Sequence, residues 1–143
     1  MIHKTILLVD DDLDDQVIFL DALTEIAKQV TCKIANNGVE AFKILQRMTP
    51  LPSIIFLDLN MPFMNGFECL GLIKKDEAYK RIPMVILTTS NDPVDEARAK
   101  GLGAQLFFTK TPDFNLLKST IMDVLTTDFS FTNMQSTKSS SQP

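Results

Sequence analysis

The chain has 143 residues and a formal net charge of -4, with 45% hydrophobic and 22% charged residues. These values are typical of one globular domain that buries a core of its own. They argue against a membrane protein, because no apolar run reaches the ~18 residues that a spanning helix needs, and against direct nucleic-acid binding, because lysine and arginine do not cluster.

The first half of the chain predicts two strand–helix pairs. Largely unbroken apolar runs at 6–9 and 32–35 are typical of parallel strands that are covered on both faces. Asp12 and Asn37 follow these runs at positions suited to cap a helix. The expected apolar stripes of the two helices are Val17, Leu20, Leu23 and Ala27, and then Val39, Phe42, Ile44 and Leu45.

The second half continues this alternation. Apolar runs at 54–57, 84–87 and 106–108 predict three more strands. We expect Asn65 or Gly66 to start the third helix and Asp92 to start the fourth. The apolar stripes expected here are Phe67, Leu70 and Ile73; Val94, Ala97 and Leu102; and Phe114, Leu117, Ile121 and Leu125.

Five strands that alternate with helices predict a doubly wound α/β fold, with a parallel sheet and helices on both faces. We expect this domain to occupy residues 1–127. From residue 128 the composition turns to Ser, Thr, Gln and Asn without apolar periodicity, so residues 128–143 are expected to form a disordered tail.

Polar side chains follow four of these strands at their carboxyl ends. Asp10 and Asp11 follow the first strand, Asp58 the third, Thr88 the fourth and Lys110 the fifth. In an open parallel sheet, binding crevices form at this edge where the strand order reverses, so we expect these side chains to converge. Carboxylates gathered in one crevice repel each other, and Mg²⁺, which prefers oxygen ligands, relieves that repulsion.

A site of this composition suits phosphoryl transfer. Asp58 would be the nucleophile and would form an acyl phosphate. Lys110 and the Thr88 hydroxyl would hold the phosphoryl oxygens while charge redistributes. The neighbouring acids Asp12, Asp14 and Asp15 are expected to be solvated residues of a helix start, where they favour the helix dipole.

Four segments, LLVDDD, FLDLNMPFMNGFE, VILTTS and FFTK, resemble the signature segments of response-regulator receiver domains, and the resemblance spans residues 4–125. It implies a flavodoxin-like, five-stranded parallel sheet of order 2-1-3-4-5. The stretch KKDEAYKRIP and the pair Thr88–Thr89 are most similar to single-domain regulators that are paired with phytochrome-type kinases.

The resemblance also implies a metal-binding acceptor site. It makes Asp58 the phosphorylation site and Asp11 a direct metal ligand. Asp10 matches a position at which the family's residue contacts the metal through a water molecule or differs between members. The backbone carbonyl of Asn60 would be a further ligand. The implied metal is Mg²⁺.

Thr88 and Lys110 match the hydroxyl and the amine of the family's site. Phe107 lies where the family has its aromatic switch residue, and Gly66 where the loop after the acceptor turns. One departure is visible: the family's lysine is usually followed directly by proline, often through a cis bond, whereas Thr111 intervenes here.

The implied function is that of a cytoplasmic, single-domain response regulator in a two-component phosphorelay, not an enzyme. Its phosphodonor would be a sensor histidine kinase or a histidine phosphotransfer protein. Its output would be altered binding to a downstream target protein, and a homodimer through the last helices and strand is left open. The widely separated Cys32 and Cys69 and the lack of a signal-like N-terminus agree with the cytoplasm.

Two alternatives stay open at this point. Haloacid-dehalogenase-type phosphatases also begin with a strand that ends in Asp-x-Asp, as Asp10 and Asp12 do, but their later acidic pair is replaced here by Thr88–Thr89. The other alternative is a receiver-like binding module that works without phosphorylation.

Overall fold

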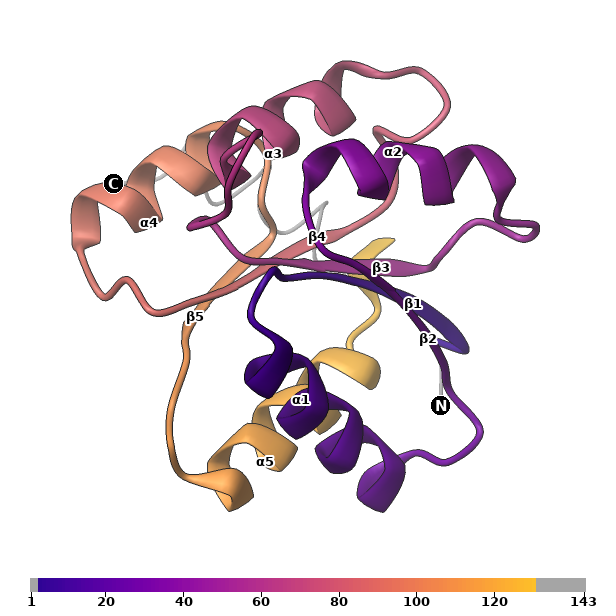
Figure 1. Cartoon of the computed structure of the whole chain (residues 1–143), viewed down its shortest axis with the longest axis vertical. Helices are drawn as coiled ribbons and strands as arrows, with labels where there is room; N and C mark the ends of the chain where they lie inside the picture. The colour runs from indigo at the N-terminus through magenta and orange to yellow at the C-terminus, as the bar shows by residue number, and fades with distance from the viewer. Residues whose placement is uncertain (1–2, 131–143) are drawn as a thin grey trace.

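The computed structural model describes residues 3–130, which form a parallel sheet with helices on both faces (Figure 1). The sheet has the predicted order, β2-β1-β3-β4-β5, and all four strand pairs are parallel. The strands are β1 (Thr5–Val9), β2 (Thr31–Ala35), β3 (Ile54–Leu57), β4 (Met84–Thr88) and β5 (Leu106–Thr109). The predicted fold class is confirmed.

The helices cover the sheet in two unequal groups. Helices α1 and α5 lie on one face, and α2, α3 and α4 lie on the other (Figure 1). Their bounds are α1 (Leu13–Ile26), α2 (Gly38–Arg47), α3 (Gly66–Lys75), α4 (Pro93–Gly101) and α5 (Phe114–Leu125). The sheet is therefore the middle of three layers.

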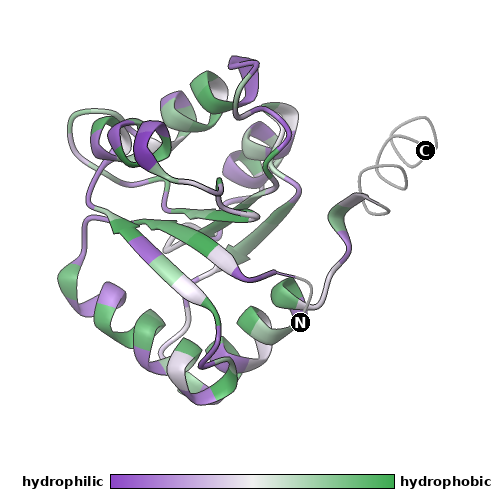
Figure 2. Ribbon diagram, turned by 90° about the vertical axis from the view of Figure 1, so that its right-hand side faces the viewer, coloured by the Kyte–Doolittle hydropathy of each residue, from purple (hydrophilic) through white to green (hydrophobic). Residues whose placement is uncertain are grey.

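Apolar side chains of the central strands fill both interlayer spaces. Leu7 and Val9 of β1 belong to the core beneath α2, α3 and α4, whereas Ile6 and Leu8 belong to the core beneath α1 and α5. This alternation is the period-2 geometry of a strand that is buried on both sides, and it explains the unbroken apolar runs. Figure 2 shows the contrast between the largely hydrophobic strands and the mixed hydropathy of the helices.

Side-chain caps start the helices at the predicted positions. Asp12, Asn37 and Asp92 each accept a hydrogen bond from a backbone N–H in the first turn of the helix that follows. Asn65, and not Gly66, caps α3, and Asp113 caps α5 in the same way. These side chains satisfy donors that a helix start would otherwise leave unpaired.

Three of the predicted helical stripes were wrong in part. Val17 of α1, Val39 of α2 and Val94 of α4 are 56%, 46% and 70% exposed. In α1 the buried face instead contains Gln16 and Phe19. The stripes expected for α3 and α5 are confirmed, with Phe67 and Phe114 partly buried and the remaining members buried.

The two ends of the described chain meet beside the core. Nε2 of His3 lies 2.7 Å from the backbone carbonyl oxygen of Thr127, and the His3 ring contacts the ring of Phe129. Phe129, two residues beyond the predicted domain boundary, is buried. Residues 131–143 of the predicted tail lie outside the described residues. Within residues 3–130, no helix is long and apolar enough to cross a membrane.

Candidate functional site

The candidate site lies at the carboxyl edge of the sheet, where the chain leaves β1 and β3. The backbone N–H groups of Asp10 and Asp58 donate to the carbonyl oxygens of Ala35 and Val9, at 3.0 and 2.9 Å. These bonds extend the strand ladders by one residue, so both aspartates start from rigid backbone. Because β1 has β2 on one side and β3 on the other, this is the point where the strand order reverses.

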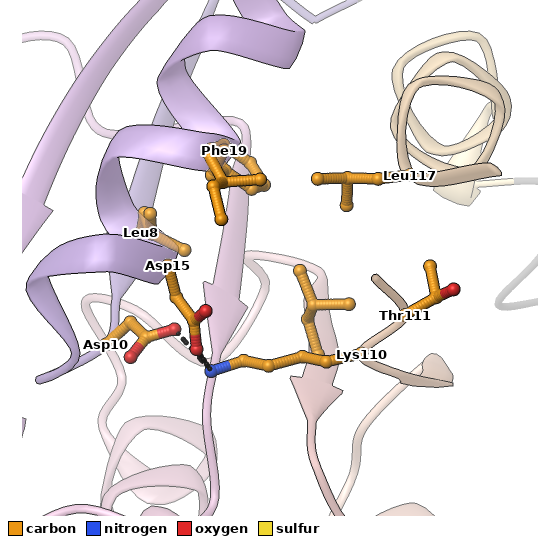
Figure 3. Close-up of a pocket in the computed structure, with 9 residues that line it drawn as sticks. Leu8, Asp10, Asp15, Phe19, Lys110, Thr111 and Leu117 are labelled. Carbon is orange, nitrogen blue, oxygen red and sulfur yellow. Dashed lines mark hydrogen bonds and ion pairs between the residues drawn. The ribbon is translucent and has the colours of Figure 1, made fainter. Parts of the chain in front are cut away.

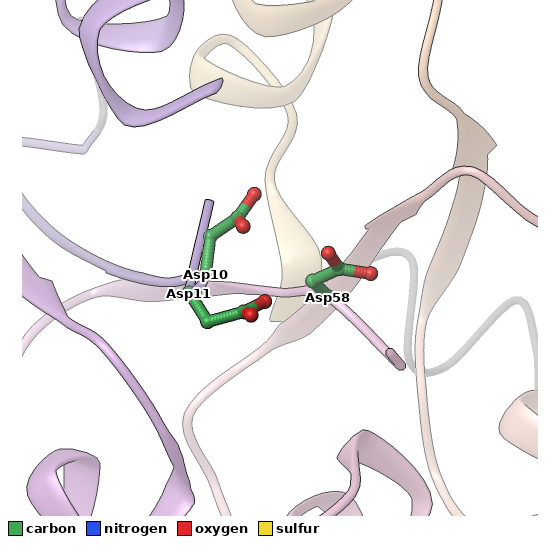
Figure 4. A group of neighbouring side chains, drawn as sticks. All are labelled: Asp10, Asp11 and Asp58. Atoms are coloured by element: carbon green, nitrogen blue, oxygen red, sulfur yellow. The ribbon is translucent and has the colours of Figure 1, made fainter. Parts of the chain in front are cut away.

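Asp10, Asp11 and Asp58 converge at this edge (Figure 4). One carboxylate oxygen from each lies within 4.8 Å of those of the other two. Asp10 and Asp58 are buried, whereas Asp11 is exposed. Hard oxygen donors gathered this closely fit a divalent cation such as Mg²⁺, which keeps several waters and takes few protein ligands.

Hydrogen bonds hold Asp10 from both its backbone and its side chain. The backbone N–H of Asp12 donates to Asp10 Oδ1 at 2.9 Å. The Gln16 amide donates to the Asp10 carbonyl oxygen at 2.6 Å and to Asn36 Oδ1 at 2.8 Å. Burial raises the pKa of Asp10, although hydrogen bonds from Lys110 and from the Asp12 backbone act in the opposite direction.

Lys110 brings a cation to the same group of carboxylates. Its Nζ lies 2.8 Å from Asp10, 3.0 Å from Asp58 and 2.7 Å from Asp15. Figure 3 shows the Lys110 side chain reaching across to the start of α1, with its nitrogen beside the carboxylates of Asp10 and Asp15. Burial alone would lower the pKa of Lys110, but its hydrogen bonds with these three carboxylates raise the pKa above its ordinary value.

Asn60 lies beside Asp58, and Thr88 ends β4, the strand that pairs with β3. Thr88 is fully buried, and its hydroxyl has no hydrogen-bond partner among residues 3–130. The backbone N–H of Asn60 donates to Asp58 Oδ1 at 3.2 Å, and the Asn60 amide donates to the Thr89 hydroxyl at 3.3 Å. The Asn60 backbone thus lies beside Asp58.

Gly66 brings the start of α3 close to the loop that follows Asp58. Its backbone N–H donates to the carbonyl oxygen of Leu59 at 2.9 Å. A Cβ at this position would overlap the carbonyl oxygen of Asp58 and the Cα of Leu59. Only glycine lets the helix start this near the backbone of Asp58 and Leu59.

The end of β5 accommodates Thr111 without the cis bond that is frequent in the family. The cis peptide bond found among residues 3–130 is Thr49–Pro50, so the bond between Lys110 and Thr111 is trans. Phe107 lies opposite Ile86 in the β4–β5 ladder and is partly buried against the core under α2, α3 and α4. It lies two strands away from Asp58.

Sequence reasoning missed two residues of this site. Asp15 was expected to be solvated, but it forms an ion pair with Lys110. Its partner Lys110 lies 95 residues away, so no local pattern in the sequence indicates this ion pair. Gln16 also has no signal in the sequence, because its role depends on contacts with Asp10 and Asn36 that appear only after folding.

Comparisons with known proteins agree with this geometry. Residues 6–134 match the family model of the response regulator receiver domain. The response regulator Rcp1 of Synechocystis sp. is 34% identical over 113 residues, which cover 76% of this chain and 77% of that protein.

Two solved structures extend the similarity to three dimensions. The Mn²⁺-bound form of response regulator Rcp1 has a TM-score of 0.79 at 31% identity, with 87% of this chain and 96% of that one covered. The phosphorylated cyanobacterial phytochrome response regulator RcpA has a TM-score of 0.77 at 31% identity, with 85% and 91% covered.

Proposed function

The chain belongs to the response regulator receiver domain family, and on that premise we propose that Asp58 accepts a phosphoryl group from a phosphohistidine donor in a Mg²⁺-dependent reaction. The predicted resemblance to receiver domains, including those of phytochrome regulators, is confirmed. One observation carries the proposal. Asp58 lies together with Asp10 and Asp11, while Lys110 contacts Asp58 itself.

In the proposed reaction, a carboxylate oxygen of Asp58 attacks the phosphorus of the donor. A P–O bond forms, the P–N bond to the donor imidazole breaks, and the imidazole leaves with the electron pair of that bond. The orientation of the carboxylate supports this role, because Oδ1 accepts from the Asn60 backbone and Oδ2 from Lys110. The nucleophile is therefore fixed before the donor arrives.

Asp10, Asp11, Asp58 and the backbone carbonyl of Asn60 would hold the cation. When bound, Mg²⁺ would offset the negative charge of the carboxylates and of the phosphoryl oxygens. The oxygen-only donor set supports a hard cation, and the related regulator Rcp1 has been solved in a Mn²⁺-bound form.

Lys110 and Thr88 would bind the phosphoryl oxygens. Lys110 already contacts Oδ2 of the Asp58 carboxylate, so its ammonium lies next to the place where the phosphoryl group would be attached. The Thr88 hydroxyl is buried without a partner among the described residues, and it is free to donate to a phosphoryl oxygen. Both groups would stabilise charge that exists only while the phosphoryl group is present.

The output would follow from a change at Thr88 and Phe107. Thr88 would move toward the phosphoryl group, and Phe107 would fill the space behind it, which shifts a pre-existing equilibrium at the surface of α4, β5 and α5. A beryllofluoride complex tests this step by nuclear magnetic resonance. Chemical-shift changes confined to the loop after Asp58 would contradict it.

Two polar residues near the acceptor are expected to set the lifetime of the acyl phosphate. Asn60 lies two residues after Asp58, and Ser90 lies two residues after Thr88. The Asn60 amide is held by Thr89, and the Ser90 hydroxyl donates to Asp95 at 2.6 Å. Both side chains therefore have defined positions, and the resemblance to the family implies that they would flank the path of an attacking water.

The phosphodonor would be a sensor histidine kinase or a histidine phosphotransfer protein of the cytoplasm. We propose that the chain acts as a single-domain regulator and not as an enzyme, so that its message passes by binding to a downstream target protein. A homodimer through α4, β5 and α5 would use the same surface.

Labelling with acetyl phosphate tests the proposed function. The protein is incubated with the phosphodonor with and without Mg²⁺, and the modified residue is mapped. We expect acid-labile phosphate on Asp58 only when Mg²⁺ is present, and no incorporation in Asp58→Asn. Asp14→Asn, which removes an exposed acid of α1, is the control for a change of charge. Equal labelling of Asp58→Asn and the wild type would overturn the assignment.

A further inference from the structure

The ammonium group of Lys110 uses all of its donors on carboxylates. A lysine ammonium has three N–H donors, and Lys110 Nζ contacts Asp10, Asp15 and Asp58 at 2.7–3.0 Å. Asp10 and Asp58 belong to the acidic group that would hold the cation. Asp15 does not belong to that group, yet its contact with Lys110 is the shortest of the three.

The first turn of α1 fixes Asp15 in place. The Asp15 backbone N–H donates to the side chain of the N-cap residue Asp12 at 3.0 Å. The next residue, Gln16, is anchored to the Asp10 carbonyl and to Asn36. Asp15 therefore projects from backbone that is held on both sides, and its side chain is only 34% exposed.

The stem of Lys110 lines a largely apolar cavity between α1 and α5 (Figure 3). This cavity has a volume of about 50 Å³ and brings Asp10, Asp15 and Lys110 together beside apolar side chains, namely Leu8, Ile18, Phe19, Leu87 and Leu117. Apolar walls accommodate the methylene groups of a lysine but give its charged head no direction. The direction of the ammonium must come from the carboxylates.

We propose that Asp15 is a positioning residue whose ion pair holds the Lys110 ammonium at the start of α1. The ammonium then stays beside Asp58 while Asp58 accepts the phosphoryl group and Asp10 faces the cation. This inference rests on the proposed function. Asp58 would bond to phosphorus and Asp10 would face the cation, and both changes weaken their hold on Lys110. Asp15 has no competing task, so its ion pair persists throughout.

The alternative is that Asp15 only favours the positive end of the α1 dipole, as any acid in a first turn does. Asp14 distinguishes the dipole effect from the positioning of Lys110. It lies in the same turn, is exposed, and forms no ion pair with a described residue. Asp14→Asn and Asp15→Asn remove the same charge from neighbouring positions. If only the dipole matters, the two variants behave alike.

The first experiment observes Lys110 directly and needs no phosphorylation. In the full chain with nitrogen-15-labelled lysine and without metal, a Lys110 ammonium held by carboxylates gives a slowly exchanging signal, which Lys110→Arg identifies by its loss. We expect this signal in the wild type and in Asp14→Asn, and its loss through fast exchange in Asp15→Asn. Lys74, whose ammonium donates to the carbonyl oxygens of Lys80 and Ile82, is the internal reference in every variant. An unchanged Lys110 signal in Asp15→Asn would overturn the inference.

The second experiment measures the initial rate of phosphate incorporation from acetyl phosphate with Mg²⁺. Asp15→Asn should be slower than Asp14→Asn by about 10- to 100-fold, the range that a displaced catalytic group costs. In a Lys110→Arg background, Asp15→Asn should add less than it does alone, since it acts through Lys110.

The outcomes distinguish this inference from the function on which it rests. Incorporation at Asp58 in the wild type together with equal rates in the two variants would overturn the role of Asp15 and leave the proposed function standing. No incorporation in the wild type would overturn both.

Discussion

The backbone N–H of Lys110 donates to the carbonyl oxygen of Thr88 at 2.6 Å, one residue beyond the last β4–β5 register pair, Thr88 and Thr109. The two residues are thus tied through their backbones while their side chains differ in their surroundings. The ammonium of Lys110 is saturated with carboxylates, whereas the hydroxyl of Thr88 is buried without a partner among the described residues.

Thr88→Val should stabilise the protein and impair its function. The change replaces an unpaired buried hydroxyl with a methyl group of similar size, and an unsatisfied group of this kind costs about 1–3 kcal/mol. We expect the free energy of unfolding in urea to rise by about 1 kcal/mol, while phosphate incorporation slows. Thr109→Val is the matched control, because the Thr109 hydroxyl donates to the Ser90 carbonyl and its loss should not stabilise. A Thr88→Val protein less stable than the wild type would contradict the expectation.

Asp10 should make stability depend on pH in the absence of metal. Burial raises the pKa of Asp10 in the folded protein above its ordinary value, so folding favours the protonated carboxyl. This contribution to stability is present below pH 3.8, the ordinary pKa, and is lost as the pH rises through the folded pKa. Asp10→Asn should therefore be more stable than the wild type at pH 7, and the difference should shrink on acidification. The measurement is urea unfolding in the presence of a chelator, from pH 7 to pH 3.8, with Asp14→Asn as the control. A difference in unfolding free energy between Asp10→Asn and the wild type that does not change with pH would contradict the prediction.

Asp11 should be needed for stabilisation by the cation. A ligand that binds only the folded state adds about 2.7 kcal/mol at 100 times its Kd, so saturating Mg²⁺ should raise the melting temperature of the wild type, and chelation should reverse the rise. In Asp11→Ala the rise should be largely lost, because this variant removes one of the gathered carboxylates. Asp14→Ala should retain it. The measurement is thermal unfolding with and without Mg²⁺. If Mg²⁺ raises the melting temperature of Asp11→Ala as much as that of the wild type, Asp11 is not a metal ligand.

Gly66→Ala should destabilise the loop that carries Asp58. The added Cβ would overlap backbone atoms of Asp58 and Leu59, which cannot move as a flexible side chain can. Overpacking of this kind costs about 1–3 kcal/mol. Gly101→Ala at the end of α4 meets no atom within 4 Å and has no left-handed backbone, so it should be neutral or slightly stabilising. The measurement is urea unfolding of both variants. Similar unfolding free energies for Gly66→Ala and Gly101→Ala would show that the added Cβ at position 66 does not overlap its neighbours.

Much of the fold was predictable because the central strands are buried on both faces. β3 was predicted with its observed bounds, and the other strands extend the predicted ranges by a single residue. The convergence of Asp10, Asp11, Asp58 and Lys110 was also predictable, since polar residues at the carboxyl ends of parallel strands meet at one edge.

The remaining features depend on contacts between distant segments. Asp15 could not be assigned, because its partner Lys110 lies 95 residues away. The buried face of α1 was misplaced because the burial of Gln16 depends on Asn36, which pairs with its amide. Apolar residues alone therefore pointed to Val17, which is exposed.

Phe63 is a further feature without a sequence signal, and it carries the last prediction. Its φ is 67°, in the left-handed region, and its side chain is 89% exposed, so burial does not offset the backbone strain. The left-handed conformation costs about 1–2 kcal/mol for most residues but is tolerated by asparagine. Phe63→Asn should therefore raise the free energy of unfolding by about 0.5–1 kcal/mol. Phe63→Ala removes the same aromatic ring but keeps an unfavoured side chain in this region, so its stability should stay close to that of the wild type. Equal unfolding free energies for the Asn and Ala variants in urea would show that the backbone of Phe63 stores no strain.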